Sequence, residues 1–230
     1  MTEPTPATTP RVGRPRRFDA DTERGMIMDA AMRLMALNGY AQTSVGEILA
    51  DAGLSTRSFY RHFESKEALL LALLERDAAA VARSLERAVA AASDPVAAIE
   101  AWLERFLDVF YEPRRAARVA LFSSPAVRGS YPLADVLQDM RRVFCRPLVG
   151  ALRAGHEAGL LRSLTPEADA NSLFALVSAA ADRHEAHFQQ RAAARAHVVR
   201  FAWPALGLPE GETPGGPRSR RADERGRARR

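Results

Sequence analysis

The chain has 230 residues, of which 47% are apolar and 27% charged, enough for one or two domains with a buried core. It has no run of 18 or more apolar residues and no apolar segment of the signal-peptide type, so we expect neither a membrane partner nor export. The single cysteine, Cys145, excludes an intramolecular disulfide framework and agrees with a reducing compartment. A cytoplasmic location is therefore expected.

The net charge of +5 is concentrated at the two ends of the chain. Residues 1–20 carry +2 and residues 207–230 carry +3, which leaves the part between them neutral. Both ends are poor in large apolar residues, so we expect a disordered basic N-terminal arm over 1–20 and a disordered basic tail over 207–230. The Gly-Arg-Pro-Arg-Arg run of the arm suits a narrow minor groove, and a solvated tail explains it equally well.

Helix-start signals and a glycine turn are concentrated between residues 43 and 67. Ser44 and Glu47 have the S-x-x-E spacing of a capping box, and Ser55 is a good N-cap for the next helix. Gly53 can adopt the positive φ that ends the first of these helices. A helix, a glycine turn and a second helix form the outline of a helix-turn-helix, whose second helix enters a DNA major groove.

The second helix of this motif has an apolar side and a polar side. Leu54, Phe59 and Phe63 are spaced to face inward. We expect the remaining residues on the outer side, where they suit phosphates and base edges: Thr56, Arg57, Ser58, Tyr60, Arg61 and His62. A solvated face on an ordinary core helix has the same composition, so this helix alone does not decide the function.

A helix predicted over residues 21–38 precedes the motif and is expected to pack behind it. Its apolar residues recur at spacings of four, four and three: Met26, Ala30, Leu34 and Leu37. Asn38 and Gly39 end this helix, and Tyr40 is expected to close the small core.

The segment resembles the N-terminal DNA-binding domain of the TetR family of bacterial transcriptional regulators. Three strings match that family in order and spacing: Ala52-Gly53-Leu54-Ser55, Tyr60-Arg61-His62-Phe63 and Ser65-Lys66-Glu67-Ala68-Leu69. The resemblance covers roughly residues 24–74. It departs at Arg57-Ser58-Phe59, where the common form is Gly-Thr-Leu, and at Leu49, which is often Ala.

The resemblance implies an all-α protein with a three-helix helix-turn-helix domain over 21–67. A helical-bundle ligand-binding and dimerisation domain would follow over 68–206. The implied function is that of a ligand-responsive transcriptional regulator, by default a repressor released from a pseudo-palindromic operator in double-stranded DNA. We expect no enzymatic activity, no cofactor and no metal site, and a location at the nucleoid.

Position within the matched motif also implies roles for individual residues. The phosphate-contact candidates are Thr43, Tyr60, His62 and Lys66. Thr56 and Arg57 are the candidates for base edges, because an arginine can pair with guanine in a bidentate manner. Arg61 is a further candidate for base edges, and Ser58 suits either role. Ser44 and Ser55 complete the expected DNA-binding set.

The rest of the chain also has a helical pattern. A long helix is predicted from Ser65 to about residue 93, followed by helices over 95–111, 114–127, 133–159, 166–189 and 191–206. Prolines at 95, 113, 132 and 166 fall at or near these helix starts, where a missing N–H costs nothing. No alternation of period two appears, so a sheet is not expected.

Six aromatic residues of these helices are candidates for a ligand pocket: Trp102, Phe106, Phe110, Phe122, Phe144 and Phe174. Aromatic residues at helical spacing more often form a core, yet small ligands bind between the helices of a bundle. As a set they suggest an apolar or aromatic small-molecule effector.

The last two predicted helices, over about 166–206, are candidates for a homodimer interface. Their small residues, such as Ala175, Ser178 and Ala179, permit close helix approach. The resemblance implies a four-helix interface between two copies, and an intrachain core would show the same pattern.

Two other functions stay open. His184 and His187 are three residues apart and not at the i, i+4 spacing of a zinc-protease motif, but with Asp182 they can still meet a metal. The first alternative is therefore a metal-dependent enzyme that uses His184 and His187. The second is a ligand-independent architectural DNA-binding protein that uses its basic ends.

Overall fold

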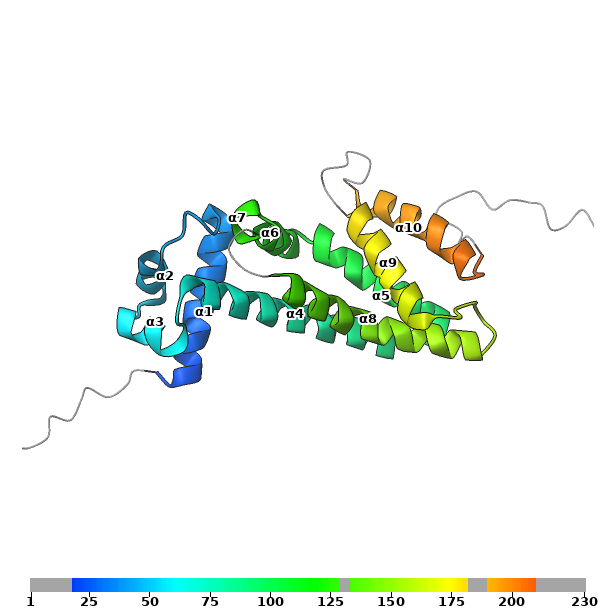
Figure 1. Ribbon diagram of the computed structural model, residues 1–230, viewed down its shortest axis with the longest axis horizontal. Coiled ribbons are helices and arrows are strands. Elements are labelled where there is room, and N and C mark those ends of the chain that lie inside the picture. Colours follow the sequence, from blue (N-terminus) through cyan, green and yellow to red (C-terminus); the bar gives the residue numbers. More distant parts are fainter. Residues whose placement is uncertain (1–17, 129–132, 182–189, 210–230) are drawn as a thin grey trace, which may run out of the picture. The chain divides into compact units, whose positions relative to one another are not determined.

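The computed structural model describes residues 18–128, 133–181 and 190–209 (Figure 1). The regular structure of these ranges is α-helical, with helices α1 to α10 and no strand, as the predicted all-α fold requires. The chain divides into two compact units, Met1–Leu73 (unit 1) and Leu74–Arg230 (unit 2). The boundary falls within α4, a helix that begins in unit 1 and continues in unit 2.

Unit 1 contains three helices and the start of a fourth: α1 (Ala20–Asn38), α2 (Val45–Ala52), α3 (Thr56–His62) and α4 (Lys66–Ala90). The Asp19 side chain caps α1 by accepting a hydrogen bond from the Thr22 amide. Helix α2 begins with the predicted capping box, in which the Ser44 amide donates to Glu47 at 2.7 Å and the Glu47 amide donates to Ser44 Oγ at 3.2 Å. Local hydrogen bonds therefore fix where these helices begin.

The core of unit 1 differs from the predicted apolar stripe of α1. The buried apolar residues of α1 are Ile27, Met28, Ala30, Ala31, Met32 and Met35. Leu37, predicted to face inward, is 76% exposed, while Met26 and Leu34 are only half-buried. Helix α1 contacts both α2 and α3, and the stripe that it buries is centred on its neighbouring apolar positions. Almost every α1 position near this stripe is apolar, so the spacing could not select the correct one.

Unit 2 consists of the remainder of α4 followed by six helices: α5 (Pro95–Tyr111), α6 (Pro113–Phe122), α7 (Pro125–Arg128), α8 (Leu133–Glu157), α9 (Pro166–Ala180) and α10 (Arg191–Ala205). The single helix predicted over 114–127 is wrong, because the chain leaves α6 at Ser123 and Pro125 starts α7. Helix α9 ends at Ala180, and residues 182–189 of the predicted 166–189 helix lie outside the described residues.

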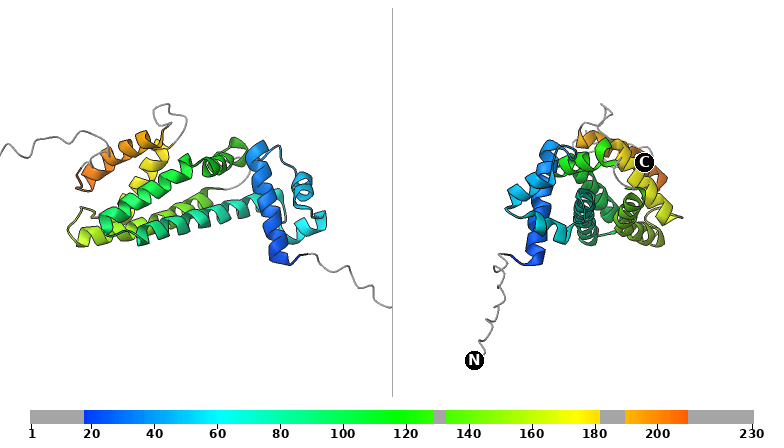
Figure 2. Two further views of the ribbon diagram at one scale, coloured as in Figure 1. Left: turned by 180° about the vertical axis from the view of Figure 1, so that it is seen from behind. Right: turned by 60° about the vertical axis from the view of Figure 1, so that its left-hand side comes forward.

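Helices α5, α8, α9 and α10 pack together around one apolar core. The two ribbon views of Figure 2 show the arrangement of these helices from different sides. Helix α5 supplies four of its most deeply buried side chains: Trp102, Leu103, Phe106 and Leu107. These residues follow one another at helical spacing, so a single face of α5 enters the core. None of the described helices is long and apolar enough to span a bilayer.

Candidate DNA-binding surface and ligand-binding domain

Helix α3 is held in place mainly by its surroundings. With seven residues it is too short to be stable alone. Gly53 ends α2 with φ 65°, and Ser55 Oγ accepts a hydrogen bond of 3.3 Å from the Ser58 amide at the start of α3. Phe59 and Phe63 are 0% and 4% exposed and anchor the helix in the core. The helix-turn-helix outline predicted from the sequence is therefore present.

The outer face of α3 is narrower than predicted. Thr56, Arg57, Tyr60 and Arg61 are exposed, as expected. Ser58 is 7% exposed and the His62 side chain 8%, so the prediction that both lie on the outer side is wrong. They directly precede the buried Phe59 and Phe63 in sequence, and α3 contacts both α1 and α2. The exposed polar surface is therefore formed by fewer residues than the sequence suggested.

A buried carboxylate from α1 meets the C-terminal end of α3. Glu23 is 6% exposed, and its Oε2 atom lies 2.7 Å from Arg61 Nη1 and 3.5 Å from His62 Nε2. Sequence analysis missed Glu23, because 38 residues separate it from Arg61 and no local spacing connects them.

Two further candidate residues precede α2. Thr43 is 1% exposed, and its hydroxyl donates a hydrogen bond of 2.9 Å to the Gly39 carbonyl. Ser44 is exposed and is engaged in the capping box. The Thr43 hydroxyl is thus already used inside unit 1, and its contact with a phosphate stays a prediction.

The start of α4 carries the remaining candidate, Lys66. Its ammonium lies 4.2 Å from the centroid of the Tyr40 ring, and Tyr40 Oη donates a hydrogen bond of 2.9 Å to Glu67 Oε1. Burial, together with this bond to Glu67, raises the pKa of Tyr40 to about 12. Tyr40 is 7% exposed, which confirms that it closes the core of unit 1. The Tyr40 ring therefore contacts the Lys66 ammonium at the first residue of α4.

In unit 2, five of the six candidate aromatic residues form one cluster. Phe106 is its centre, with ring-centroid distances to its neighbours of 4.9 Å (Trp102), 5.0 Å (Phe174), 5.4 Å (Phe110) and 6.1 Å (Phe144). The Trp102 indole also donates a hydrogen bond of 2.9 Å to the Phe144 carbonyl. Phe122, on α6, lies outside this cluster. The rings fill the core of unit 2, and their role in binding a ligand stays a prediction.

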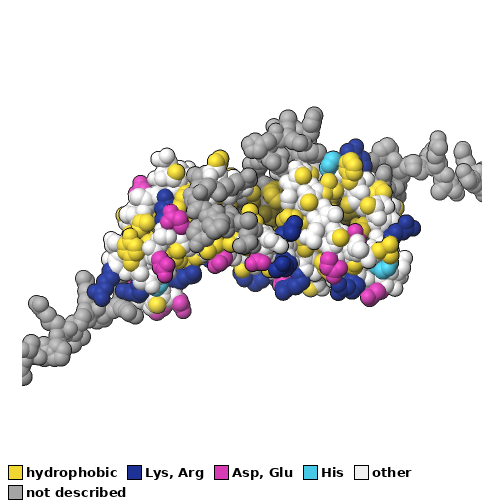
Figure 3. Space-filling model, viewed as in Figure 1, with side chains coloured by type: hydrophobic (Ala, Val, Ile, Leu, Met, Phe, Trp, Pro, Cys, Tyr) yellow, Lys and Arg dark blue, Asp and Glu magenta, His cyan; other side chains and the backbone are white. Residues whose placement is uncertain are grey.

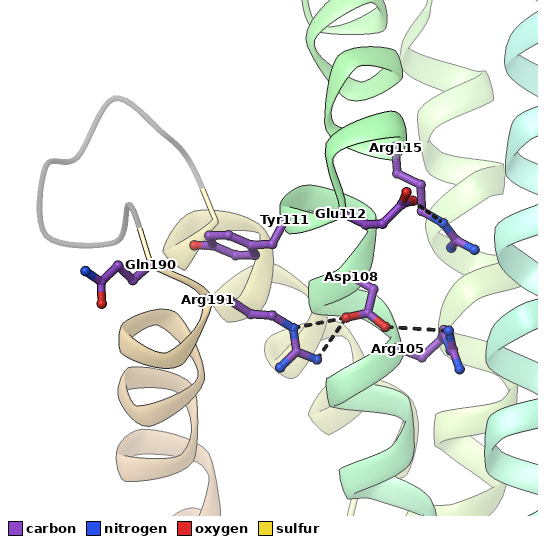
Figure 4. A pocket seen from close by; sticks show the side chains of 7 residues that line it. All are labelled: Arg105, Asp108, Tyr111, Glu112, Arg115, Gln190 and Arg191. Atoms are coloured by element: carbon purple, nitrogen blue, oxygen red, sulfur yellow. Dashed lines mark hydrogen bonds and ion pairs between the residues drawn. The ribbon is translucent and has the colours of Figure 1, made fainter.

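A surface cavity of about 800 Å³ lies elsewhere in unit 2 and is shown in Figure 4. Its lining is polar: Arg105, Asp108, Tyr111, Glu112, Arg115, Gln190 and Arg191. The arginines are paired within it, since Arg191 lies 2.9 Å and Arg105 3.5 Å from Asp108, and Arg115 lies 3.2 Å from Glu112. None of the six aromatic candidates lines this cavity. The sequence signal that could have indicated this cavity is the set of charged residues three or four positions apart on α5.

Beside this cavity, Arg191 joins α10 to α5. Arg191 Nη2 donates to the Glu104 carbonyl at 2.9 Å and lies 2.7 Å from the Glu104 carboxylate, which also pairs with Arg195. Burial disfavours the ionised form of Glu104, but hydrogen bonds from Arg195 and Arg191 keep its pKa below the ordinary value. Figure 3 shows basic and acidic side chains lying among one another on the visible face of unit 2.

Helices α9 and α10 each turn one face toward the core of unit 2. Val177 and Val198 are fully buried there. Phe201 of α10 is 56% exposed and packs against Arg200 and His197 of its own helix. Ala175 and Ala179 of α9 are also exposed. These two helices therefore retain an exposed surface of small and aromatic residues.

The alternative metal site cannot be placed. Asp182, His184 and His187 lie outside the described residues. Among the residues that are described, no group of three or more His, Cys, Asp or Glu side chains could hold a metal ion.

A three-helix unit with a helix-turn-helix and an exposed polar recognition helix, followed by a helical bundle, defines the class of all-α helix-turn-helix proteins. Residues 27–73 match the family model described as bacterial regulatory proteins, tetR family. The chain therefore carries a TetR-family DNA-binding domain over these residues.

One relative and two solved structures extend the comparison. The chain is 34% identical over 129 residues to the HTH-type transcriptional regulator EthR of Mycolicibacterium smegmatis, a match that covers 54% of this chain and 59% of EthR. A SmeT–triclosan complex superposes with a TM-score of 0.67 at 23% identity, covering 85% of this chain and 98% of SmeT. FadR from Bacillus subtilis in complex with stearoyl-CoA superposes with a TM-score of 0.62 at 18% identity, covering 76% of this chain and 95% of FadR. These two likenesses establish that the fold, including the helical body, is shared.

Proposed function

We propose that this protein is a ligand-responsive DNA-binding transcriptional regulator. The observation that carries the proposal is the family-matching helix-turn-helix of residues 27–73, which presents Thr56, Arg57 and Tyr60 on the exposed face of α3. By default it acts as a repressor on a pseudo-palindromic operator. A homodimer would place its two recognition helices in successive major grooves, about 34–36 Å apart.

The roles of individual residues follow from exposure and chemistry. Arg57 is exposed and has no ion-pair partner among the described residues, so its guanidinium can read guanine in the major groove, with Thr56 beside it. Tyr60 is 63% exposed and, with Lys66 and Ser44, suits the phosphate backbone. Ser55 is exposed and caps the N-terminus of α3.

The ligand would act through unit 2. The structures of SmeT and FadR contain triclosan, which is an apolar aromatic compound, and stearoyl-CoA, which has a long apolar acyl chain. Both support an apolar or aromatic effector for this chain. The aromatic cluster around Phe106 is the apolar site, and its rings must separate to admit such a molecule because they contact one another directly. The polar cavity beside Arg115 and Arg191 is a second site, favoured by its volume.

The dimer would form through α9 and α10, whose exposed residues include Ala175, Ala179 and Phe201. We further propose that the protein has no enzymatic role and works in the cytoplasm at the nucleoid. Metal analysis of the purified protein, with DNA binding measured before and after chelation, tests the alternative that uses His184 and His187.

The decisive experiment is a footprint on the DNA flanking its own gene, with and without candidate ligands. Protection of a two-fold symmetric sequence that disappears with an apolar aromatic ligand supports the proposal. The same footprint with an anionic aromatic ligand, compared between wild type and Arg115→Ala, tests whether the polar cavity binds the effector. Removal of residues 1–17 and 210–230 distinguishes a regulator from an architectural DNA-binding protein. The regulator keeps its preference for the operator, whereas the architectural protein no longer binds DNA.

A further inference from the structure

We propose that Glu23 is a positioning residue that withholds Arg61 from the DNA backbone. Arg61 stands on the exposed side of the recognition helix, where a free arginine would bind phosphate of any sequence. Its Nη1 atom instead lies 2.7 Å from Glu23 Oε2. The inference rests on the proposed DNA-binding function and adds to it a residue of α1, outside the helix-turn-helix.

Burial makes this pairing hard to break. The Glu23 side chain is 8% exposed, against 32% for the Arg61 side chain, so the carboxylate depends on its partners for its charge to be compensated. If Arg61 turned to a phosphate, it would leave a buried carboxylate with only His62 Nε2 at 3.5 Å. Uncompensated buried charge costs more than an exposed ion pair returns, so Arg61 stays with Glu23 when DNA is bound.

The two arginines of α3 therefore have different roles in DNA recognition. Arg57 is exposed without an ion-pair partner among the described residues, whereas Arg61 is neutralised by Glu23. Sequence-independent attraction of the recognition helix is thereby reduced, while the guanidinium at Arg57 remains available for base edges. Because non-specific binding consists almost entirely of phosphate contacts, this pairing lowers the affinity of the protein for random DNA.

The test measures binding to a random-sequence duplex as a function of salt. The substitution Glu23→Gln keeps the shape of the side chain and removes its charge, which frees Arg61 for one more phosphate contact. We expect tighter binding to random DNA and a plot of log K against log salt that steepens by about 0.9. Between 50 and 200 mM salt this adds a roughly three- to fourfold loss of affinity.

Two controls separate the release of Arg61 from the loss of a negative charge. Asp21→Asn removes an exposed carboxylate from the same first turn of α1, and should leave the slope unchanged. The double variant Glu23→Gln/Arg61→Ala should return the slope to that of wild type. A slope that stays steep in the double variant, or that steepens equally in Asp21→Asn, overturns the inference.

Arg61→Ala in the otherwise unchanged chain keeps the test valid if Glu23→Gln does not fold, as judged by helicity and thermal unfolding. We expect an unchanged salt slope, whereas Lys66→Ala should lower it by about 0.9 because Lys66 contacts a phosphate. A lowered slope in Arg61→Ala shows that Arg61 already binds phosphate and refutes the role of Glu23. Failure of the wild type to bind any duplex would reject the proposed function itself. A wild type that binds, with a Glu23→Gln variant of identical salt slope, would reject only the role of Glu23.

Discussion

The indole nitrogen of Trp102 donates a hydrogen bond of 2.9 Å to the main-chain carbonyl of Phe144 and so joins α5 to α8 inside unit 2. Trp102 is 0% exposed and its ring also contacts Phe106 at 4.9 Å. The bond therefore fixes the edge of the aromatic cluster on which an effector would act.

Replacement of this indole should destabilise unit 2 measurably. Trp102→Phe removes the donor and part of the ring, and we expect a loss of about 2 kcal/mol, the sum of one neutral hydrogen bond and a small cavity. For a domain of this size the unfolding midpoint should fall by roughly 4–8 °C, measured by circular dichroism. Trp203→Phe is the matched control, since Trp203 is 2% exposed and its indole makes no hydrogen bond within the described ranges. Equal losses in the two variants would show that the bond to Phe144 contributes nothing.

Cys145 should be almost unreactive in the folded protein. It is 4% exposed, and burial raises the pKa of its thiol to about 11. At pH 8 only about one thiol in a thousand is then ionised, and the thiolate is the reactive form. A colorimetric thiol reagent should label the native protein far more slowly than the urea-unfolded protein, and the single cysteine makes the signal unambiguous. Rapid labelling of the native state would mean that the α8–α9 contact opens readily.

The capping box of α2 should make stability sensitive to acid. The Ser44 amide and hydroxyl donate to Glu47 and lower its pKa from an ordinary value of 4.5. Because the folded-state pKa lies below the unfolded-state one, this contribution is complete above pH 4.5 and is lost as pH falls through the folded-state pKa. Glu47→Gln should therefore unfold more easily than wild type at pH 7, and the two should converge in strong acid. A constant difference across the pH range would attribute the effect to shape and not to charge.

The local features of the DNA-binding unit could be predicted from the sequence. Ser44, Glu47 and Ser55 each accept a hydrogen bond from an amide three residues away, and Gly53 adopts its positive φ of 65° within a single turn. Such short-range hydrogen bonds depend on residue type and spacing alone. The strings of residues in the recognition helix that match the TetR family allowed the family of this unit to be predicted as well.

Features that depend on packing between distant segments could not be predicted. The apolar positions of α1 admit two neighbouring stripes, and only the contacts with α2 and α3 select the one that contains Ile27 and Met35. Glu23 meets Arg61 across 38 residues, and Arg191 meets Asp108 across 83. Helical periodicity identifies which residues share a face but not which face a partner covers. The buried position of Ser58 and His62 has the same origin.

The exposed face of α10 allows a direct test of the proposed dimer. Phe201 is 56% exposed on the helix that would meet its symmetry mate, and an aromatic anchor at an interface often contributes 2 kcal/mol or more, so its loss weakens association roughly thirtyfold. Phe201→Asp should shift the protein from dimer to monomer in sedimentation velocity at micromolar concentration, and should weaken binding to a two-fold symmetric operator. Leu37→Asp is the control, because Leu37 is 76% exposed on α1 of unit 1 and should leave the dimer unchanged. A dimer that persists in Phe201→Asp with wild-type affinity would place the interface on another surface.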